Sequence, residues 1–392
     1  MIVPSLDLKA QYRSIKEEID RKLLEVVANQ GFILGPEVEA LEKEIAGRSG
    51  ARFAVGVSSG SDAQILSLMA LGIGPGDAVV TTPFTFFSTA GVIARLGARP
   101  VFCDIDETTC NLDPARLEEV LAGRSRLAAG AKIKAVVPVH LYGQCADMDR
   151  ILESAGRRGL PVVEDAAQAI GTDYPSALGV KKAGALGRCG FFSFYPTKNL
   201  GGYGDGGMIL TDDEALGAKL RTLRVHGERE RYYYDELGGN FRLDAIQAAV
   251  LRVKLRHLDG WQDARRAKAA IYDRALEDAG LVEDGAVRIP RAVYRGSGAP
   301  NFHTYHQYVI RARRRDELKE FLRSRGVGSM IYYPLPLHVQ KCFAGLGYKE
   351  GDFPRAEQAA REVLALPMYP ELNREQQDQV VASIREFYRR TP

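Results

Sequence analysis

The chain has 392 residues, of which 45% are hydrophobic and 26% charged, and its formal net charge is only +3. This length allows about two or three domains, and the balanced charge argues against a nucleic-acid or membrane-surface protein. The five cysteines show no CxxC spacing, so we expect neither a disulfide framework nor a metal site. The first residues lack the pattern of a signal peptide, and no apolar run reaches the roughly 18 residues of a membrane span. A cytoplasmic protein is therefore expected.

The N-terminal half predicts helices followed by a strand–helix alternation. Apolar residues at helical spacing predict amphipathic helices at 12–30 and 37–48. From residue 53 onward, strands and helices alternate with short connections, which predicts a largely parallel sheet with helices on both faces. Strands are expected at 53–57, 79–82, 100–104, 133–139, 160–163 and from 190 up to Pro196. Helices are expected at 63–71, from the end of the segment 83–87 through Leu96, at 114–121 and at 148–158.

The C-terminal half predicts a second, smaller unit. A helix is expected at 212–223, a charged aromatic loop at 224–234, one very long helical region at 243–277 and a domain boundary within 281–301. Strands at 308–312 and 328–333 and helices at 316–324, 354–365 and 374–390 then predict a small α+β domain. We divide the chain into a large domain, 1–255, and a linker helix with a small domain, 256–392.

Three places in this pattern suggest chemistry. Lys198 follows a buried strand and opens a glycine-dense loop, where desolvation would lower its pKa and free the amine as a nucleophile. A surface lysine in a turn is the alternative. Asp165 ends an apolar strand, so it is either a capping residue or the partner of a protonated cofactor ring nitrogen. The turn at Gly60–Ser61 leads from a strand into a helix, which suits either phosphate binding or an ordinary N-cap.

Five short motifs, taken together in their order along the chain, are more specific than any one of them alone. They lie at 31–38, 164–168, 193–198, 240–244 and 332–338, and thus span nearly the whole chain. Together they resemble the DegT/DnrJ/EryC1/StrS family of nucleotide-sugar aminotransferases, which depend on pyridoxal 5'-phosphate (PLP). The resemblance implies fold type I of PLP-dependent aminotransferases, an α/β fold with a large, mostly parallel domain and a small C-terminal α+β domain.

The resemblance also implies roles for individual residues. Lys198 would form the Schiff base with PLP and move the substrate proton, and Asp165 would keep the pyridine nitrogen protonated. Gly60, Ser61 and Ser193 would hold the phosphate together with Asn240 of the partner subunit, Phe86 would stack on the ring, and Gln168 would contact its hydroxyl side. His226, Arg242, Tyr332 and Tyr333 are candidates for binding the sugar nucleotide.

The expected function is amino transfer from glutamate to a UDP- or dTDP-linked keto sugar, for a deoxyamino sugar of a polysaccharide or O-antigen. The segment 198–207 looks more like members that act on a 3-keto sugar than on a 4-keto sugar. The resemblance implies a homodimer with shared active sites. A PLP-dependent sugar dehydratase is one alternative, although that subgroup has histidine in place of Lys198. A non-catalytic regulatory protein on the same fold is the other.

Overall fold

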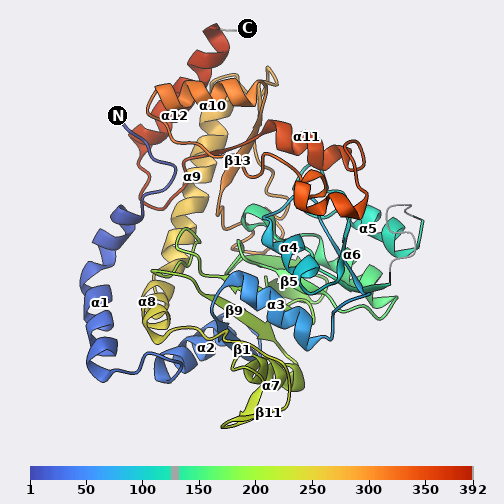
Figure 1. The fold of residues 1–392 in the computed structure, drawn as a ribbon. Coiled ribbons are helices and arrows are strands. Elements are labelled where there is room, and N and C mark those ends of the chain that lie inside the picture. Colours follow the sequence, from blue (N-terminus) through green and yellow to red (C-terminus); the bar gives the residue numbers. More distant parts are fainter. Residues whose placement is uncertain (125–131, 391–392) are drawn as a thin grey trace.

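The computed structural model describes residues 1–124 and 132–390 and confirms the α/β fold (Figure 1). A four-stranded sheet has the order β1-β9-β8-β5, and a three-stranded sheet has the order β3-β2-β4. The isolated parallel bridges Val136–Val162 and Val139–Asp165 join the two at β4 and β5. The strands are β1 (Phe53–Val57), β2 (Ala78–Thr81), β3 (Arg99–Phe102), β4 (Ile133–Val136), β5 (Val163–Asp165), β8 (Cys189–Ser193) and β9 (Gly207–Thr211).

The sheet is mostly parallel, as predicted. Strand β2 runs parallel to β3 and β4, and β5 runs parallel to β8. Strand β9 is antiparallel to both β1 and β8. We did not predict β9, because the strand follows directly on a run of glycines that we assigned entirely to a loop.

Helices cover both faces of this sheet (Figure 1). In β1, Val55 packs with the apolar side chains of α3 and α7, whereas Ala54 packs with those of α2 and α8. Successive side chains of a strand point to opposite faces, so this alternation places a core on each side. The helices of this part are α1 (Leu8–Asn29), α2 (Pro36–Ser49), α3 (Gly60–Ala70), α4 (Ser88–Arg95), α5 (Pro114–Leu121), α6 (Met148–Gly156), α7 (Glu214–Leu223) and α8 (Ala245–Leu255).

The C-terminal part has its own hydrophobic cluster. Strands β12 (Val287–Arg288), β13 (Tyr308–Ala312) and β14 (Val363–Leu366) form an antiparallel sheet next to α9 (Leu258–Asp278), α10 (Arg315–Ser324), α11 (Pro354–Glu362) and α12 (Arg374–Arg390). Val3, at the other end of the chain, is fully buried in this cluster and pairs with Val327. The division of the chain after residue 255 stays a prediction.

Several local predictions are wrong. The expected helix 243–277 is interrupted at Arg256 and His257, whose side chains both bind Glu18 of α1, at 2.6 and 3.0 Å. The expected strand 328–333 contributes only a single bridge, between Met330 and Ala365. The end of the expected helix 354–365 is strand β14, because a short apolar run fits either structure until its pairing partner is known.

Two hairpins were also missed. Strands β6 (Asp173–Ser176) and β7 (Gly179–Lys182) pair in one, and β10 (Glu228–Glu230) and β11 (Tyr233–Tyr234) pair in the other. The second hairpin lies within 224–234, which we expected to be a loop. No helix in the described parts of the chain is both long and apolar enough to cross a membrane.

Candidate active site

Lys198 lies in the loop between β8 and β9, and backbone contacts fix this loop closely. The Lys198 N–H donates to the Tyr195 carbonyl at 2.8 Å, and Gly202 N–H donates to the Phe194 carbonyl at 2.8 Å. A Cβ atom at Gly201 would lie 2.3 Å from the Pro196 carbonyl oxygen, so only glycine allows this approach. The buried amine of Lys254, on α8, donates to the Gly201 carbonyl at 2.7 Å.

The amine of Lys198 has a lowered pKa, as the sequence suggested. Burial lowers its pKa to about 8, against the opposing effect of the nearby Asp165 carboxylate. The two side chains do not form a direct ion pair. A lysine with such a pKa is partly neutral near physiological pH, and its nitrogen can act as a nucleophile or a base.

Asp165 ends β5 as a nearly buried carboxylate, only 7% exposed. Its Oδ2 accepts a hydrogen bond from the Thr89 hydroxyl at 2.8 Å, and its Oδ1 accepts one from the Ala167 N–H at 3.2 Å. Burial raises the pKa of the carboxyl group, while these two donors and the charge of Lys198 lower it. Both oxygens retain lone pairs, so this carboxylate fits a protonated ring nitrogen.

The segment at the start of α3 forms a cradle for a phosphate. The Ser59 hydroxyl caps the helix by accepting from the Asp62 N–H at 3.0 Å. Within the described chain, the N–H groups of Gly60 and Ser61 have no acceptor. A Cβ atom at Gly60 would lie 2.6 Å from the Cβ of Ser193, which shows how closely the two residues approach. Free N–H groups at a helix start, beside a serine hydroxyl, fit a phosphate group.

Gln168, another predicted site residue, contacts two tyrosines. The Gln168 Oε1 accepts from the Tyr142 N–H at 2.7 Å, and its Nε2 donates to the Tyr333 hydroxyl at 3.3 Å. The Tyr142 hydroxyl donates to the Tyr332 carbonyl. Phe86 is 57% exposed, and its ring centroid lies 6.3 Å from that of Tyr333. The exposed face of Phe86 leaves room for a stacked ring.

The remaining predicted residues are Arg242, His226 and Asn240. Arg242 pairs through its backbone with Val57, at the end of β1 just before the phosphate cradle. Its Nε is buried and has no hydrogen-bond partner among the described residues. His226 and Asn240 are exposed, and among the residues described neither makes a hydrogen bond to Lys198, Asp165 or Ser193.

The sequence did not identify every residue near Lys198. His306 comes from the C-terminal part, and its Nδ1 lies 3.1 Å from the Oδ1 of Asn199. Burial, aided by the charge of Lys198, moves the pKa of His306 well below its usual value, so the ring is neutral. Asn199 could have been suspected because it follows Lys198, but nothing in the sequence pairs it with His306. The described residues contain no cluster of three or more His, Cys, Asp or Glu that could hold a metal.

Comparisons with known proteins agree with this geometry. The model of the DegT/DnrJ/EryC1/StrS aminotransferase family matches residues 13–385. The chain belongs to this aminotransferase family. The predicted enzyme class and the predicted dependence on pyridoxal phosphate are thereby confirmed.

Individual members of the family are similar over nearly their full length. A "pleiotropic regulatory protein" of Geobacillus stearothermophilus is 54% identical, over 99% of each chain. The dTDP-3-amino-3,4,6-trideoxy-alpha-D-glucose transaminase of Streptomyces venezuelae is 42% identical, over 99% of this chain and 97% of its own. The UDP-N-acetyl-3-dehydro-alpha-D-glucosamine 3-aminotransferase of Acidithiobacillus ferrooxidans is also 42% identical, over 98% and 97%.

Solved structures of the family share the fold. S. venezuelae DesV, solved in complex with a ketimine intermediate, has a TM-score of 0.90 at 41% identity and covers 100% of both chains. Bacillus subtilis NtdA, solved with bound cofactor PMP, has a TM-score of 0.84 at 30% identity and covers 95% of this chain and 81% of its own. These similarities confirm the fold type that we expected.

Proposed function

We propose that the protein transfers an amino group from glutamate to carbon 3 of a nucleotide-linked keto sugar. The observation that carries the proposal is the Lys198 amine, with its pKa near 8 and the buried Asp165 carboxylate nearby, in the loop that follows Ser193 of the phosphate cradle. The two 42%-identical relatives named above, both assigned to 3-amino sugars, support carbon 3. The cytoplasmic location expected from the sequence is part of this proposal.

The residues of the chain divide the chemistry between them. Bound pyridoxal phosphate would supply an electron sink for the carbanion formed when the substrate loses a proton. The neutral Lys198 amine would accept that proton from the substrate carbon and return it elsewhere as a general acid. The Asp165 carboxylate, held by Thr89, would keep a proton on the ring nitrogen. The free N–H groups of Gly60 and Ser61 and the Ser193 hydroxyl would bind the phosphate.

We propose that Arg242, His226, Tyr332 and Tyr333 bind the nucleotide-linked sugar. A guanidinium suits a diphosphate, because its planar fork can donate two hydrogen bonds to one phosphate. The unpaired Nε of Arg242 supports this role. The nucleotide would supply binding energy remote from the reacting carbon, which free amino acids and simple keto acids lack.

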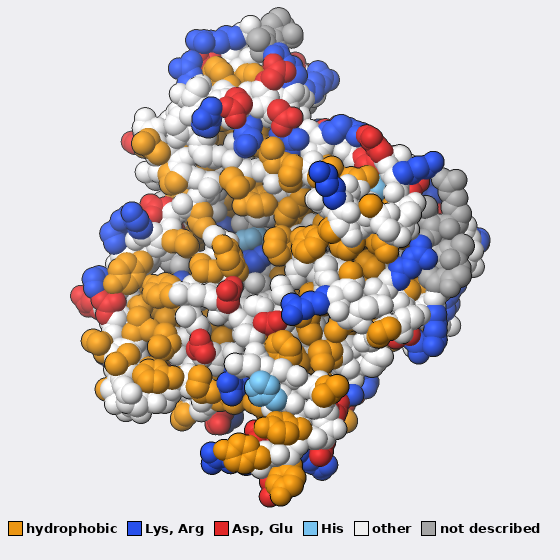
Figure 2. Space-filling model, viewed as in Figure 1, with side chains coloured by type: hydrophobic (Ala, Val, Ile, Leu, Met, Phe, Trp, Pro, Cys, Tyr) orange, Lys and Arg blue, Asp and Glu red, His pale blue; other side chains and the backbone are white. Residues whose placement is uncertain are grey.

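We also propose that two copies of the chain complete each active site. Asn240 and His226 are exposed, and among the described residues of a single chain no hydrogen bond links them to Lys198. Exposed apolar side chains that a partner could cover include Leu24 and Val27 of α1 and Tyr195 in the lysine loop. Figure 2 shows apolar side chains over the left part of this face, where Figure 1 places α1 and α8. A partner subunit covering this face would bring its own 226–242 segment to the site.

Half-reaction spectroscopy tests the function. The cofactor is first converted to its amine form with glutamate, and nucleotide-linked 3-keto and 4-keto sugars are then added one at a time. We expect rapid return of the original absorbance with a 3-keto sugar only. A return with 4-keto sugars alone would overturn the position on the sugar, and a return with simple keto acids alone would overturn the sugar assignment. Borohydride reduction should attach the cofactor to the peptide that contains Lys198.

A regulatory role is the second candidate, because the relative with 54% identity is named a pleiotropic regulatory protein. The set Lys198, Asp165 and Ser193 argues for catalysis, since a protein that acts only by binding does not need it. One measurement, the transfer of an amino group to nucleotide-linked keto sugars, distinguishes the two functions. A purified protein that binds the cofactor but transfers no amino group to any nucleotide-linked 3-keto or 4-keto sugar would favour the regulatory role.

A further inference from the structure

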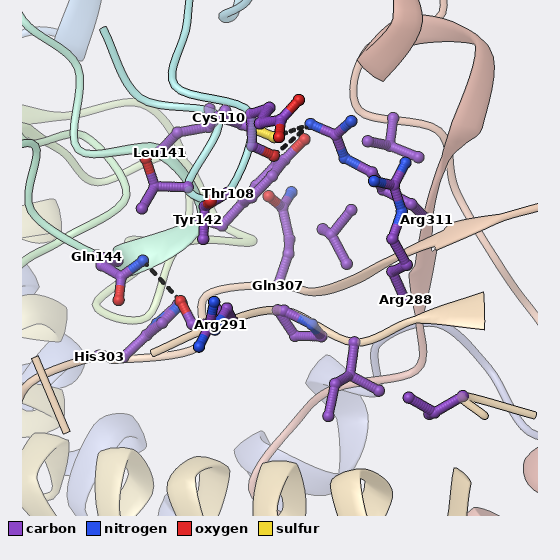
Figure 3. Close-up of a pocket in the computed structure, with 17 residues that line it drawn as sticks. Thr108, Cys110, Leu141, Tyr142, Gln144, Arg288, Arg291, His303, Gln307 and Arg311 are labelled. Atoms are coloured by element: carbon purple, nitrogen blue, oxygen red, sulfur yellow. Dashed lines mark hydrogen bonds between the residues drawn. The ribbon is translucent and has the colours of Figure 1, made fainter. Parts of the chain in front are cut away.

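A separate cavity of about 390 Å³ lies where the C-terminal sheet meets the loops after β3 and β4 (Figure 3). Its volume falls within the range of sites that bind small molecules. Lys198, Asp165 and Ser193 do not line it, so the cavity is distinct from the candidate active site. Tyr142 lines it and also contacts Gln168 and Tyr332, so the two sites share a wall.

Three arginines give this cavity a positive charge. Arg288 and Arg311 share the Glu362 carboxylate, at 2.6 and 3.4 Å, and the nearly buried Arg311 also donates to the Glu107 carbonyl at 2.6 Å. Arg291 also lines the cavity, and its guanidinium has no hydrogen-bond or ion-pair partner in the described parts of the chain. Arg291 therefore offers an uncompensated charge at the cavity.

The backbone that carries Arg291 is held in place by a buried amide. Gln144, which is only 3% exposed, donates from Nε2 to the Arg291 carbonyl at 3.1 Å. Its Oε1 accepts from the Val293 N–H at 2.8 Å. Both ends of the Gln144 amide are thus used to fix the segment 291–293. This arrangement fixes the backbone of Arg291 at the edge of the cavity, while its side chain is exposed.

His303 adds a second donor at the same end of the cavity. Burial lowers its pKa to about 3, so the ring is neutral. The Tyr305 N–H donates to its Nδ1 at 2.9 Å, which requires the single ring proton to be on Nε2. No described residue accepts a hydrogen bond from that Nε2. Figure 3 shows His303 and Arg291 close together, across the cavity from Arg288 and Arg311.

The centre of the cavity holds an acceptor instead. Gln307 extends between Arg291 and the pair Arg288 and Arg311 in Figure 3. Its Oε1 is buried and has no hydrogen-bond partner among the described residues. A buried, unpaired amide oxygen costs free energy, which a ligand that donates a hydrogen bond would recover.

We propose that this cavity binds a small hydroxycarboxylate. Its carboxylate would accept hydrogen bonds from the Arg291 guanidinium and the His303 Nε2–H, and its hydroxyl would donate to the Gln307 Oε1. Arginine forms charge-assisted, often bidentate hydrogen bonds with carboxylates, which gives such a site both affinity and orientation. Arg288 and Arg311 would attract a second acid group at the far end of the cavity.

Calorimetric titration of the holoenzyme with malate, at constant ionic strength, tests this proposal. We expect malate to bind and succinate, which lacks the hydroxyl, to bind more weakly. Arg291→Ala should weaken malate binding by about tenfold or more, because it removes a charge-assisted hydrogen bond. Arg291→Lys keeps the charge but loses the planar guanidinium. Its affinity for malate should therefore lie between those of the wild type and Arg291→Ala.

Two arginine variants serve as controls. Arg389→Ala removes the same charge from the exposed end of α12, far along the chain from every cavity residue, and should leave malate binding unchanged. Arg242→Ala, in the proposed active site, should leave it unchanged as well. The proposal is overturned if the wild-type protein does not bind malate, or if Arg291→Ala binds it as tightly as the wild type. Loss of binding in Arg242→Ala alone would place malate in the active site instead.

Discussion

At Lys198 two effects oppose each other. Burial favours the neutral amine, and the nearby Asp165 carboxylate favours the ammonium, with a net pKa of about 8. Burial dominates because the two groups form no direct ion pair, so the carboxylate acts only through space. The amine is therefore available at a pH where an ordinary lysine is almost fully protonated.

This balance predicts the pH dependence of cofactor capture. In the protein freed of cofactor, the rate at which Lys198 captures pyridoxal phosphate should rise with pH through a midpoint near 8, because only the neutral amine attacks. Asp165→Asn removes the group that raises this pKa, so the midpoint should move below 8. Stopped-flow absorbance from neutral to alkaline pH measures both. A midpoint near 10.5, the ordinary value for lysine, would contradict the assigned environment.

A second prediction concerns Thr89, which donates to the Asp165 Oδ2 at 2.8 Å. Thr89→Val keeps the shape and removes the donor, so the pKa of Asp165 should rise and its hold on the ring proton should weaken. A hydrogen bond to a charged group contributes about 1.5–3 kcal/mol, so kcat should fall about 10- to 100-fold. Thr89→Ser, which keeps the hydroxyl, is the control. Steady-state kinetics measures kcat for both variants. An equal fall in kcat for Thr89→Val and Thr89→Ser would contradict this role of the Thr89 hydroxyl.

The sequence singled out Lys198 and Asp165 as candidates but not their neighbours, for a physical reason. A charged residue at the end of an apolar strand, or a few residues after it, is visible as a break in the pattern. Thr89 lies inside a predicted helical region, where a threonine gives no signal. His306 approaches Asn199 only after the C-terminal part has packed against the sheet. Contacts between distant segments cannot be read from local periodicity.

At the scale of elements, the loop between β8 and β9 depends on α8. The amine of Lys254 is buried without a carboxylate partner, and it lies 4.5 Å from the centroid of the Tyr203 ring. This amine donates to the Gly201 carbonyl, and the Oε1 of Gln247 accepts from the Tyr203 N–H. These two hydrogen bonds connect the loop to one face of α8. Lys254 is therefore a positioning residue for the segment that carries Lys198.

The third prediction tests this positioning. Lys254→Met should leave the Gly201 carbonyl without its donor, so backbone amides of 199–204 should exchange with deuterium faster than in the wild type. The pH midpoint of cofactor capture by Lys198 should also move. Lys43→Met, on the exposed face of α2, is a matched control and should change neither quantity. Unchanged exchange in Lys254→Met would mean that the loop holds its shape by itself.

The elements themselves were predictable to different degrees. Strand β1 and helix α5 have the bounds that periodicity and capping residues indicated. Strand β9 was missed although Met208, Ile209 and Leu210 are fully buried, because three apolar residues after a glycine loop are too few to show a period. Strand β14 was assigned to a helix for a similar reason: its pairing with β13 decides its conformation.

At the scale of the whole molecule, the proposed dimer makes the fourth prediction. If Asn240 serves the partner's site, mixing Lys198→Ala with Asn240→Ala subunits creates hybrid dimers with one doubly altered site and one intact site. Activity should therefore reappear when two nearly inactive proteins are mixed and allowed to exchange subunits. Native mass spectrometry checks the exchange. If hybrids form and no activity returns, Asn240 acts within its own chain.

The buried position of Val3 has a consequence for synthesis on the ribosome. Its N–H donates to the Gly326 carbonyl and its carbonyl accepts from the Gly328 N–H, both at 2.8 Å. Val3 leaves the ribosome long before Gly326 and Gly328, which follow it only after the whole central sheet has been made. The first residues must therefore wait, unpaired, while the central sheet forms, and such distant pairing is slow. Deletion of residues 1–5 should consequently impair the C-terminal unit, although the two are far apart in the sequence.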